Sequence, residues 1–170
     1  GRVPTPNAMK FYISQLMDEK EMSLADEVKA KEEVWDVRDD LDELLKEATH
    51  ALAERTKSLA VAATDEGKIF HSGYSNVFSN PEFANMKTCA NLFSFIEEAD
   101  KLQNLFFERP LSGSTIDVFF GEELGWPALH PVGVVTTHFN AKGNNRAIAV
   151  MVPVRLSYTT NIPVLRYFKR

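Results

Sequence analysis

Hydrophobic residues recur at helical spacing through a long segment, Ser23 to Lys57, that contains neither glycine nor proline. Gaps of three and four residues alternate along one stripe, which consists of Val34, Val37, Leu41, Leu44, Ala48 and Ala51. Ser23 and Asp26 have the spacing of a capping box, so we expect one continuous helix. At 1.5 Å per residue that helix is about 50 Å long, which is more than one compact domain needs.

Two interpretations fit this long helix. It can be a core helix whose acidic face is solvated, or it can pack one face on its own domain and another on a second subunit. Under the second interpretation, the residues predicted at the dimer interface are Val34, Val37, Leu41, Leu44 and Ala48.

The first residues have a different pattern. GRVPTP is typical of an extended segment, because a residue before proline avoids the helical region. Apolar residues from Met9 to Met17 then follow at helical spacing. We expect residues 1–22 to form a linker and a short helix, and residues 23–170 to form one domain.

Beyond Lys57 the periodicity changes to that of strands. Leu59 to Thr64 is a short apolar run, and Asp65-Glu66-Gly67 is a turn signal before a returning strand, Lys68 to Ser72. We expect Gly73 to Ser79 to be irregular. Asn80-Pro81 then predicts the start of a helix that runs to about Glu108.

The rest of the chain predicts three more strands and a helix. Thr115 to Phe120 alternates, Gly121 to Leu129 is a loop, and Asn140 to Asn145 is a hairpin loop between Val132–Phe139 and Arg146–Val152. A last helix is expected from Ser157 toward Lys169. Hairpins dominate and no βαβ repeat is visible, so the predicted fold is α+β, an antiparallel sheet of about five strands flanked by helices.

Charge bears on the possible partners. The formal net charge is −5, and the acidic residues concentrate between Asp18 and Glu54. Domains that hold nucleic acid on their own usually present a basic face to the phosphates. These 170 residues are therefore poor candidates for binding DNA by themselves.

Composition also suggests a compartment. No apolar run approaches the roughly 18 residues of a membrane span, and no apolar segment typical of a signal peptide follows Arg2. The single cysteine, Cys89, excludes an internal disulfide and fits a reducing compartment. We expect a cytoplasmic protein without a membrane partner.

Catalytic signals are sparse. There is no phosphate-binding glycine loop, no H-E-x-x-H and no nucleophile elbow. His71 and His138 fall on predicted strands that can meet, but a metal site needs three or four converging ligands. Glu122 and Glu123 are adjacent on a loop, where neighbouring side chains usually diverge. We predict no catalytic residue, no metal and no cofactor, and a protein that is not an enzyme.

A ligand pocket is the other possibility that the residues leave open. Sheets with this order of elements form small-molecule pockets, and Trp126 and Phe139 are the candidates to line one. Packing in the core or at an interface is the simpler role for both side chains.

Several segments, in order, resemble one family. SGYSNVFSNPEF resembles the Gly-Gly-x-x-Asn-Leu-Leu-x-x-Pro-Glu-Phe segment of the heat-inducible transcription repressor HrcA. AIAVMVPVRLSY is similar to the family's Gly-Val-Ile-Gly-Pro-Thr-Arg-Met-x-Tyr. GRVPT, FFGEEL and the run from Val132 to Phe139 also have counterparts. The matching motif positions are Gly73, Asn76, Pro81, Glu82, Phe83, Pro153, Arg155 and Tyr158.

This resemblance implies a GAF-like domain, in agreement with the predicted order of elements. It implies repression of chaperone genes by a homodimer that binds an inverted-repeat operator, called CIRCE, through a winged-helix domain. It also implies a link between activity and a GroEL-type chaperonin.

The sequence departs from the family in three places. The winged-helix domain is not among these residues, and only Asp65 to His71 stands where the family carries an inserted dimerising domain. Val152 and Val154 replace the Gly and Thr that flank Pro153. We therefore predict the regulatory and dimerisation domain of a shortened HrcA-like repressor of heat-shock genes. The alternative is a GAF-type small-molecule sensor.

Overall fold

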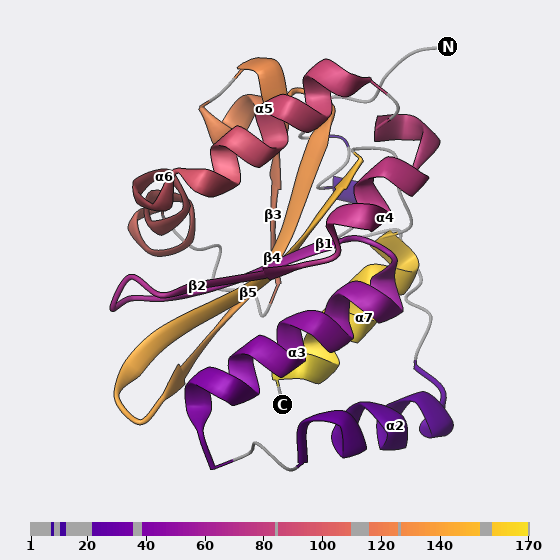
Figure 1. The fold of residues 1–170 in the computed structure, drawn as a ribbon, viewed down its shortest axis with the longest axis vertical. Coiled ribbons are helices and arrows are strands. Elements are labelled where there is room, and N and C mark those ends of the chain that lie inside the picture. The colour runs from indigo at the N-terminus through magenta and orange to yellow at the C-terminus, as the bar shows by residue number, and fades with distance from the viewer. Residues whose placement is uncertain are drawn as a thin grey trace.

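A five-stranded antiparallel sheet divides the molecule into two layers of helices (Figure 1). The strands lie in the order β2-β1-β5-β4-β3, which confirms the predicted α+β fold. The computed structural model describes residues 8, 11–12, 22–35, 39–83, 85–109, 116–125, 127–153 and 158–169. Most of the lead-in predicted over residues 1–22 therefore lies outside the described residues.

The five strands lie close to their predicted positions. Their bounds are β1 Leu59–Thr64, β2 Ile69–Ser72, β3 Asp117–Phe120, β4 Val132–Ala141 and β5 Asn144–Pro153. The predicted hairpin loop is shorter than expected, because Ala141 pairs with Asn144 and leaves a two-residue turn. Lys142 and Gly143 in that turn both have positive φ, as the tight hairpin turns of twisted sheets require.

The prediction of a single long helix from Ser23 to Lys57 is wrong. The structure has two helices there, α2 (Leu24–Trp35) and α3 (Leu41–Thr56). Asp40 is extended, and its side chain accepts hydrogen bonds from the backbone N–H groups of Asp42 and Glu43, so it caps α3. The expected Ser23 cap does begin α2, because the Ser23 hydroxyl accepts from the Asp26 N–H at 3.2 Å.

Two other predicted segments differ in a similar way. Gly73 to Ser79 is not irregular, since Tyr74–Ser79 forms the short helix α4. The helix predicted from Pro81 to Glu108 is divided into a 3-10 turn and the shorter helices α5 (Met86–Glu97), α6 (Ala99–Gln103) and η3 (Asn104–Glu108). Asn85 caps α5, and an extended Glu98 ends it.

Helices cover the two faces of the sheet differently. The helices α4, α5 and α6 lie on one face, and α3 with α7 (Tyr158–Lys169) lies on the other (Figure 1). Helix α2 packs outside the second layer, beside α3. We call these the α5 face and the α3 face.

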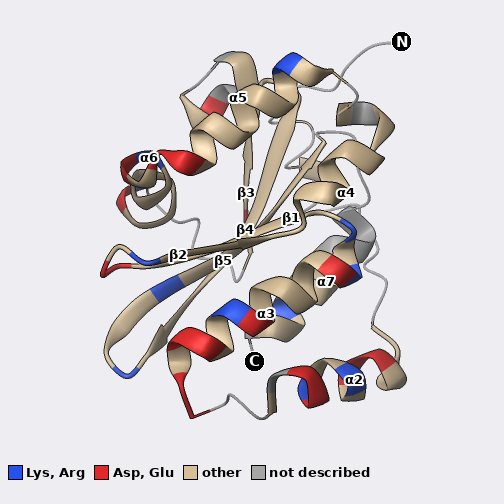
Figure 2. Cartoon of the chain, in the orientation of Figure 1, with Lys and Arg blue, Asp and Glu red and all other residues tan. Residues whose placement is uncertain are grey.

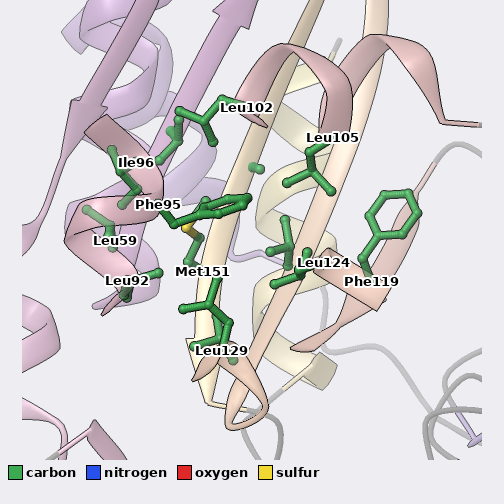
Figure 3. Packing of buried hydrophobic residues seen from close by; sticks show 14 of the residues in the cluster. Leu59, Leu92, Phe95, Ile96, Leu102, Leu105, Phe119, Leu124, Leu129 and Met151 are labelled. Carbon is green, nitrogen blue, oxygen red and sulfur yellow. The ribbon is translucent and has the colours of Figure 1, made fainter. Parts of the chain in front are cut away.

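The α5 face is closed by large apolar side chains. Phe95 of α5 and Leu102 of α6 belong to the same buried cluster as Leu59 of β1 and Met151 of β5 (Figure 3). The alternation predicted for β3 is confirmed, because Phe119 joins this core while Ile116 and Phe120 join the core of the α3 face. Each face therefore has its own hydrophobic core.

Candidate functional site

A cleft opens on the α3 face, between α2, α3, α7 and the far end of the β4–β5 hairpin. Its volume is about 600 Å³. Apolar side chains form most of its walls, among them Leu41, Leu44, Leu45, Ala48, Phe139 and Ile148. Polar groups line the remainder, from Glu27, Lys31, Asn140, Arg146 and Tyr167.

The residues predicted at a dimer interface are only partly described. Leu41, Leu44 and Ala48 are half-buried and line the cleft. Val37 lies outside the described residues, and the side chain of Val34 is not described. The break at Asp40 means that Val34 and Leu41 do not share one helix. Their role at a subunit contact stays a prediction.

Of the two residues predicted to line a ligand pocket, only one is described by the structure. Phe139 is half-buried and lines the cleft. Trp126 lies outside the described residues. Of the two candidates, Phe139 is therefore the one whose place at the cleft is described.

Arg146 is the charged group at the base of the cleft. It is 5% exposed and lies opposite Phe139 in the β4–β5 register. Its Nη1 donates to the carbonyl oxygens of Ala141 at 2.7 Å and Asn144 at 3.3 Å, so the hairpin turn holds the guanidinium in place. Its Nε is buried without a hydrogen-bond partner. Sequence reasoning missed Arg146, because a basic residue on a strand carries no signal of its burial.

The acidic groups near Arg146 have other partners. Asp42 forms an ion pair with Lys68. Its hydrogen bond, and then its charge, raise the pKa of the Lys68 ammonium. The Glu66 carboxylate accepts from the Asn144 side chain at 2.6 Å, and the Asp65 carboxylate accepts from the Asn145 N–H at 2.8 Å. Asp42 and Glu66 line a shallow hollow that Arg146 also lines, and Figure 2 shows further acidic residues along α2 and α3.

Two polar contacts attach α2 to the layer behind it. The Arg55 guanidinium donates to the Glu33 carboxylate at 2.7 Å and lies over the Phe168 ring, 5.9 Å from its centre. The Tyr167 hydroxyl donates to the backbone carbonyl of Glu27 at 2.8 Å. The hydrogen bond from Arg55 lowers the pKa of the Glu33 carboxyl, although partial burial acts in the opposite direction. The outer wall of the cleft is therefore held by polar contacts.

Two of the family-motif residues join α3 to the start of β1. Asn76 donates through its side-chain amide to the carbonyl oxygens of Ala53 and Ser58, at 3.2 and 3.0 Å. Gly73 has a φ of +94°, and a Cβ there would lie 2.4 Å from the Ser58 carbonyl oxygen. Asn76 thus supplies hydrogen-bond donors to carbonyl groups at and just beyond the C-terminal end of α3, and Gly73 allows the backbone to approach that end closely.

The other motif positions have varied surroundings. Phe83 is buried in the core of the α5 face, and its carbonyl accepts from the Cys89 thiol. Pro153 is buried at the end of β5, and Pro81 begins a 3-10 turn. Arg155 lies outside the described residues, and the side chains of Glu82 and Tyr158 are not described.

Other candidates for chemistry do not converge. His71 and His138 lie on β2 and β4, with β1 and β5 between them, and His138 bonds the Phe106 carbonyl instead. The Glu123 carboxylate accepts from the Phe120 N–H at 2.8 Å, which supports the turn after β3. Within the described ranges, no three His, Cys, Asp or Glu side chains gather as metal ligands do, and no helix has the length and apolar character of a membrane span.

The fold places the chain in a broad class. A five-stranded antiparallel sheet in this order, with helices on both faces, defines an α+β domain. The chain also matches the fold of a crystal structure described only as that of a hypothetical protein, with a TM-score of 0.66. That match covers 99% of this chain and 77% of the other, at 12% identity, so it shows the fold alone.

The sequence comparisons define the family. The chain belongs to the HrcA family, because the family model of the HrcA protein C terminal domain matches residues 7–162. It is 29% identical over 104 residues to the heat-inducible transcription repressor HrcA of Geobacter sulfurreducens, covering 61% of this chain and 30% of that protein. The HrcA of Carboxydothermus hydrogenoformans is 23% identical over 137 residues, which cover 75% and 39% of the two chains. The chain thus spans about a third of the length of these curated relatives.

Proposed function

We propose that this chain is the regulatory and dimerisation domain of a heat-inducible transcription repressor that acts in the cytoplasm. The observation that carries the proposal is the match to the C-terminal domain of the family over residues 7–162. The curated relatives bear the name of a heat-inducible transcription repressor. A role without catalysis is part of this proposal. It is supported by the separation of His71 and His138 on different strands and by the use of the Asp42 carboxylate in an ion pair with Lys68.

DNA recognition in this proposal belongs to a winged-helix segment outside these 170 residues. The net charge of −5 supports that division of labour, because phosphate contacts require a basic surface. An inverted-repeat operator demands two-fold symmetry in the protein that reads it. The contribution of this domain is then to hold two DNA readers at a fixed spacing.

Two surfaces are candidates for the subunit contact. The first is the predicted set Val34, Val37, Leu41, Leu44 and Ala48. The second is a row on the outer side of α2, where Leu24, Val28 and Trp35 are 77%, 49% and 59% exposed. Their spacing of four and seven residues aligns them on one helix face, and a row of large exposed apolar side chains is a common feature of interfaces.

Self-association tests the proposal directly. We expect the 170-residue chain to be a dimer at micromolar concentration in light scattering after size exclusion. Val28→Asp should produce a folded monomer if the outer row of α2 is the contact, and Leu41→Asp should do so if the predicted set is. Lys29→Asp, on an exposed neighbour of Val28, controls for added charge. A wild-type monomer at this concentration would contradict the dimerisation role.

Repression provides an independent readout. Fused behind a helix-turn-helix domain that represses only as a dimer, the chain should restore repression of a reporter. The substitution that yields a monomer in solution should abolish that repression. Fusion protein that accumulates without repressing, while the wild-type chain is dimeric, would contradict a role in spacing DNA readers.

The chaperonin link implied by the resemblance is a separate part of the proposal. Purified GroEL should bind the folded, fluorescently labelled chain and raise its anisotropy. A chain that GroEL binds only after denaturation would remove the chaperonin from the proposed regulation and leave the dimerisation role standing.

A further inference from the structure

We propose that the cleft on the α3 face binds a small amphipathic carboxylic acid, with its carboxylate on Arg146 and its apolar body against Leu44, Ala48 and Phe139. This goes beyond the proposed function, since neither dimerisation nor DNA spacing needs a ligand. It takes the outer row of α2, and not Leu44 and Ala48, as the subunit contact. The inference rests on two features of the cleft: an incompletely paired buried guanidinium and apolar walls.

The guanidinium is positioned before any ligand arrives. Its Nη1 is held by the carbonyl oxygens of Ala141 and Asn144, on either side of the hairpin turn. The Arg146 Nε is buried without a partner. Nε and Nη2 form one edge of a guanidinium, and a carboxylate can accept from both groups of that edge. A fixed fork of this kind loses little conformational freedom on binding.

The charge on Arg146 has no close counterion among the described residues. An arginine does not lose its proton in a protein, and a buried charge is costly unless it is paired. The carboxylates of Asp42, Glu66 and Asp65 are used by Lys68, by the Asn144 side chain and by the Asn145 N–H. A ligand carboxylate would supply both the missing charge and the missing acceptor.

The walls define the rest of the ligand. A cleft of about 600 Å³ lies within the range of pockets that enclose small molecules, which is roughly 300 to 1,000 Å³. Phe139 and Ile148 rise from the strands beside Arg146, and Leu44 and Ala48 face them from α3. A small inorganic anion would leave these walls uncovered, so the site suits an alkyl or aryl chain that carries the carboxylate.

The charged groups around the cleft bear on the charge of the ligand. Glu27 and Lys31 line the cleft, and the adjoining shallow hollow is lined by the carboxylates of Asp39, Asp40, Asp42 and Glu66 together with the cations of Lys68, Lys142 and Arg146. A negatively charged group on a ligand is repelled by nearby carboxylates. A nucleotide or another polyphosphate would bring several negative charges toward these carboxylates, whereas one carboxylate needs only Arg146. The one incompletely paired guanidinium of the cleft therefore suits a ligand with one carboxylate.

Titration calorimetry of the 170-residue chain with decanoate, and with decanol as the uncharged probe, tests this inference. Decanoate should bind saturably at one site per chain, and decanol should bind at least tenfold more weakly. Arg146→Met should weaken decanoate binding by about tenfold to a hundredfold, which is the range for hydrogen bonds to charged groups. Arg146→Lys should retain part of the affinity because it keeps the charge.

A second variant covers the possibility that Arg146 is needed for folding. Leu44→Trp fills the cleft and leaves the guanidinium untouched, so it should abolish decanoate binding while circular dichroism stays native. Phe78→Trp, on the exposed part of the α5 face, adds an indole away from the cleft and should leave binding unchanged. Equal binding of decanol and decanoate, unchanged affinity in a folded Arg146→Met or Leu44→Trp variant, or no saturation at millimolar decanoate would overturn the inference.

Discussion

The two faces of the sheet are covered by helices but differ in how closely the side chains beneath those helices pack. The α5 face is filled by side chains such as Phe95, Leu92 and Leu105, each at most 2% exposed (Figure 3). The α3 face has a smaller core and a cleft of about 600 Å³. Arg146 is buried beside that cleft, and Arg55 of α3 pairs with Glu33 of α2.

This difference separates stability from function. A close-packed face has no room for a ligand or for a helix to shift, because interiors pack at the density of organic crystals. On the α3 face, α2 is attached through Arg55, Glu33 and Tyr167, and these polar contacts can be exchanged for water. Regulation is therefore expected on the α3 face, and the α5 face is expected to supply the stable base.

The strongest test of the comparison is truncation on each face. Phe95→Ala removes a buried ring from a packed core and should lower the free energy of unfolding by about 3–5 kcal/mol. Leu44→Ala, on the half-buried wall of an existing cleft, should lower it by about 1 kcal/mol, because little new cavity forms. Urea unfolding of both variants measures the difference. Equal losses would mean that the two faces are equally packed.

The junction between the faces comes next in size. Gly73→Ala should lower the free energy of unfolding by about 2–3 kcal/mol, because an alanine there is strained at φ +94° and meets the Ser58 carbonyl. Gly67 has a φ of +95°, but a Cβ there would have nothing within 4 Å, so Gly67→Ala isolates the backbone strain at about 1 kcal/mol. The difference between the two variants in thermal unfolding measures the cost of the steric contact at residue 73.

Asn76 offers a smaller change at the same junction. Asn76→Ala leaves the Ala53 and Ser58 carbonyls without the amide that they accept from, and should lower the free energy of unfolding by about 1–2 kcal/mol. Asn104→Ala removes an exposed amide that bonds Glu108 and should change stability by less than about 0.5 kcal/mol. Hydrogen exchange at the end of α3 should speed up only in the Asn76 variant.

The smallest effect is expected where α2 is attached. Glu33→Gln removes the ion pair with Arg55, which is partly exposed, and should change stability by about 1 kcal/mol or less. The folded-state pKa of Glu33 lies below its ordinary value of 4.5. The contribution is thus present above pH 4.5 and is lost as the pH falls through the lowered folded pKa. Chemical unfolding of wild type and Glu33→Gln should therefore converge in acid, and a gap that persists there would point to another cause.

Sequence periodicity predicted the strands well and the helix boundaries less well. β1 and the β4–β5 hairpin follow from apolar runs and from a turn that needs positive φ at Lys142 and Gly143. The helix boundaries at Asp40 and Asn85 were missed because a capping side chain looks like any other polar residue within a helical pattern. Asp40 and Glu43 do have capping-box spacing, and that signal identifies the break in retrospect.

The sequence by itself determined the α+β class, the antiparallel sheet and the HrcA resemblance, since these depend on local periodicity and on motifs read in order. Only the tertiary structure decided that Leu41, Leu44 and Phe139 share a cleft, and that Arg146 is buried at its base. The physical reason is that burial and pairing depend on contacts between distant segments. In this protein α2, α3, the hairpin and α7 must all be in place before the environment of Arg146 exists.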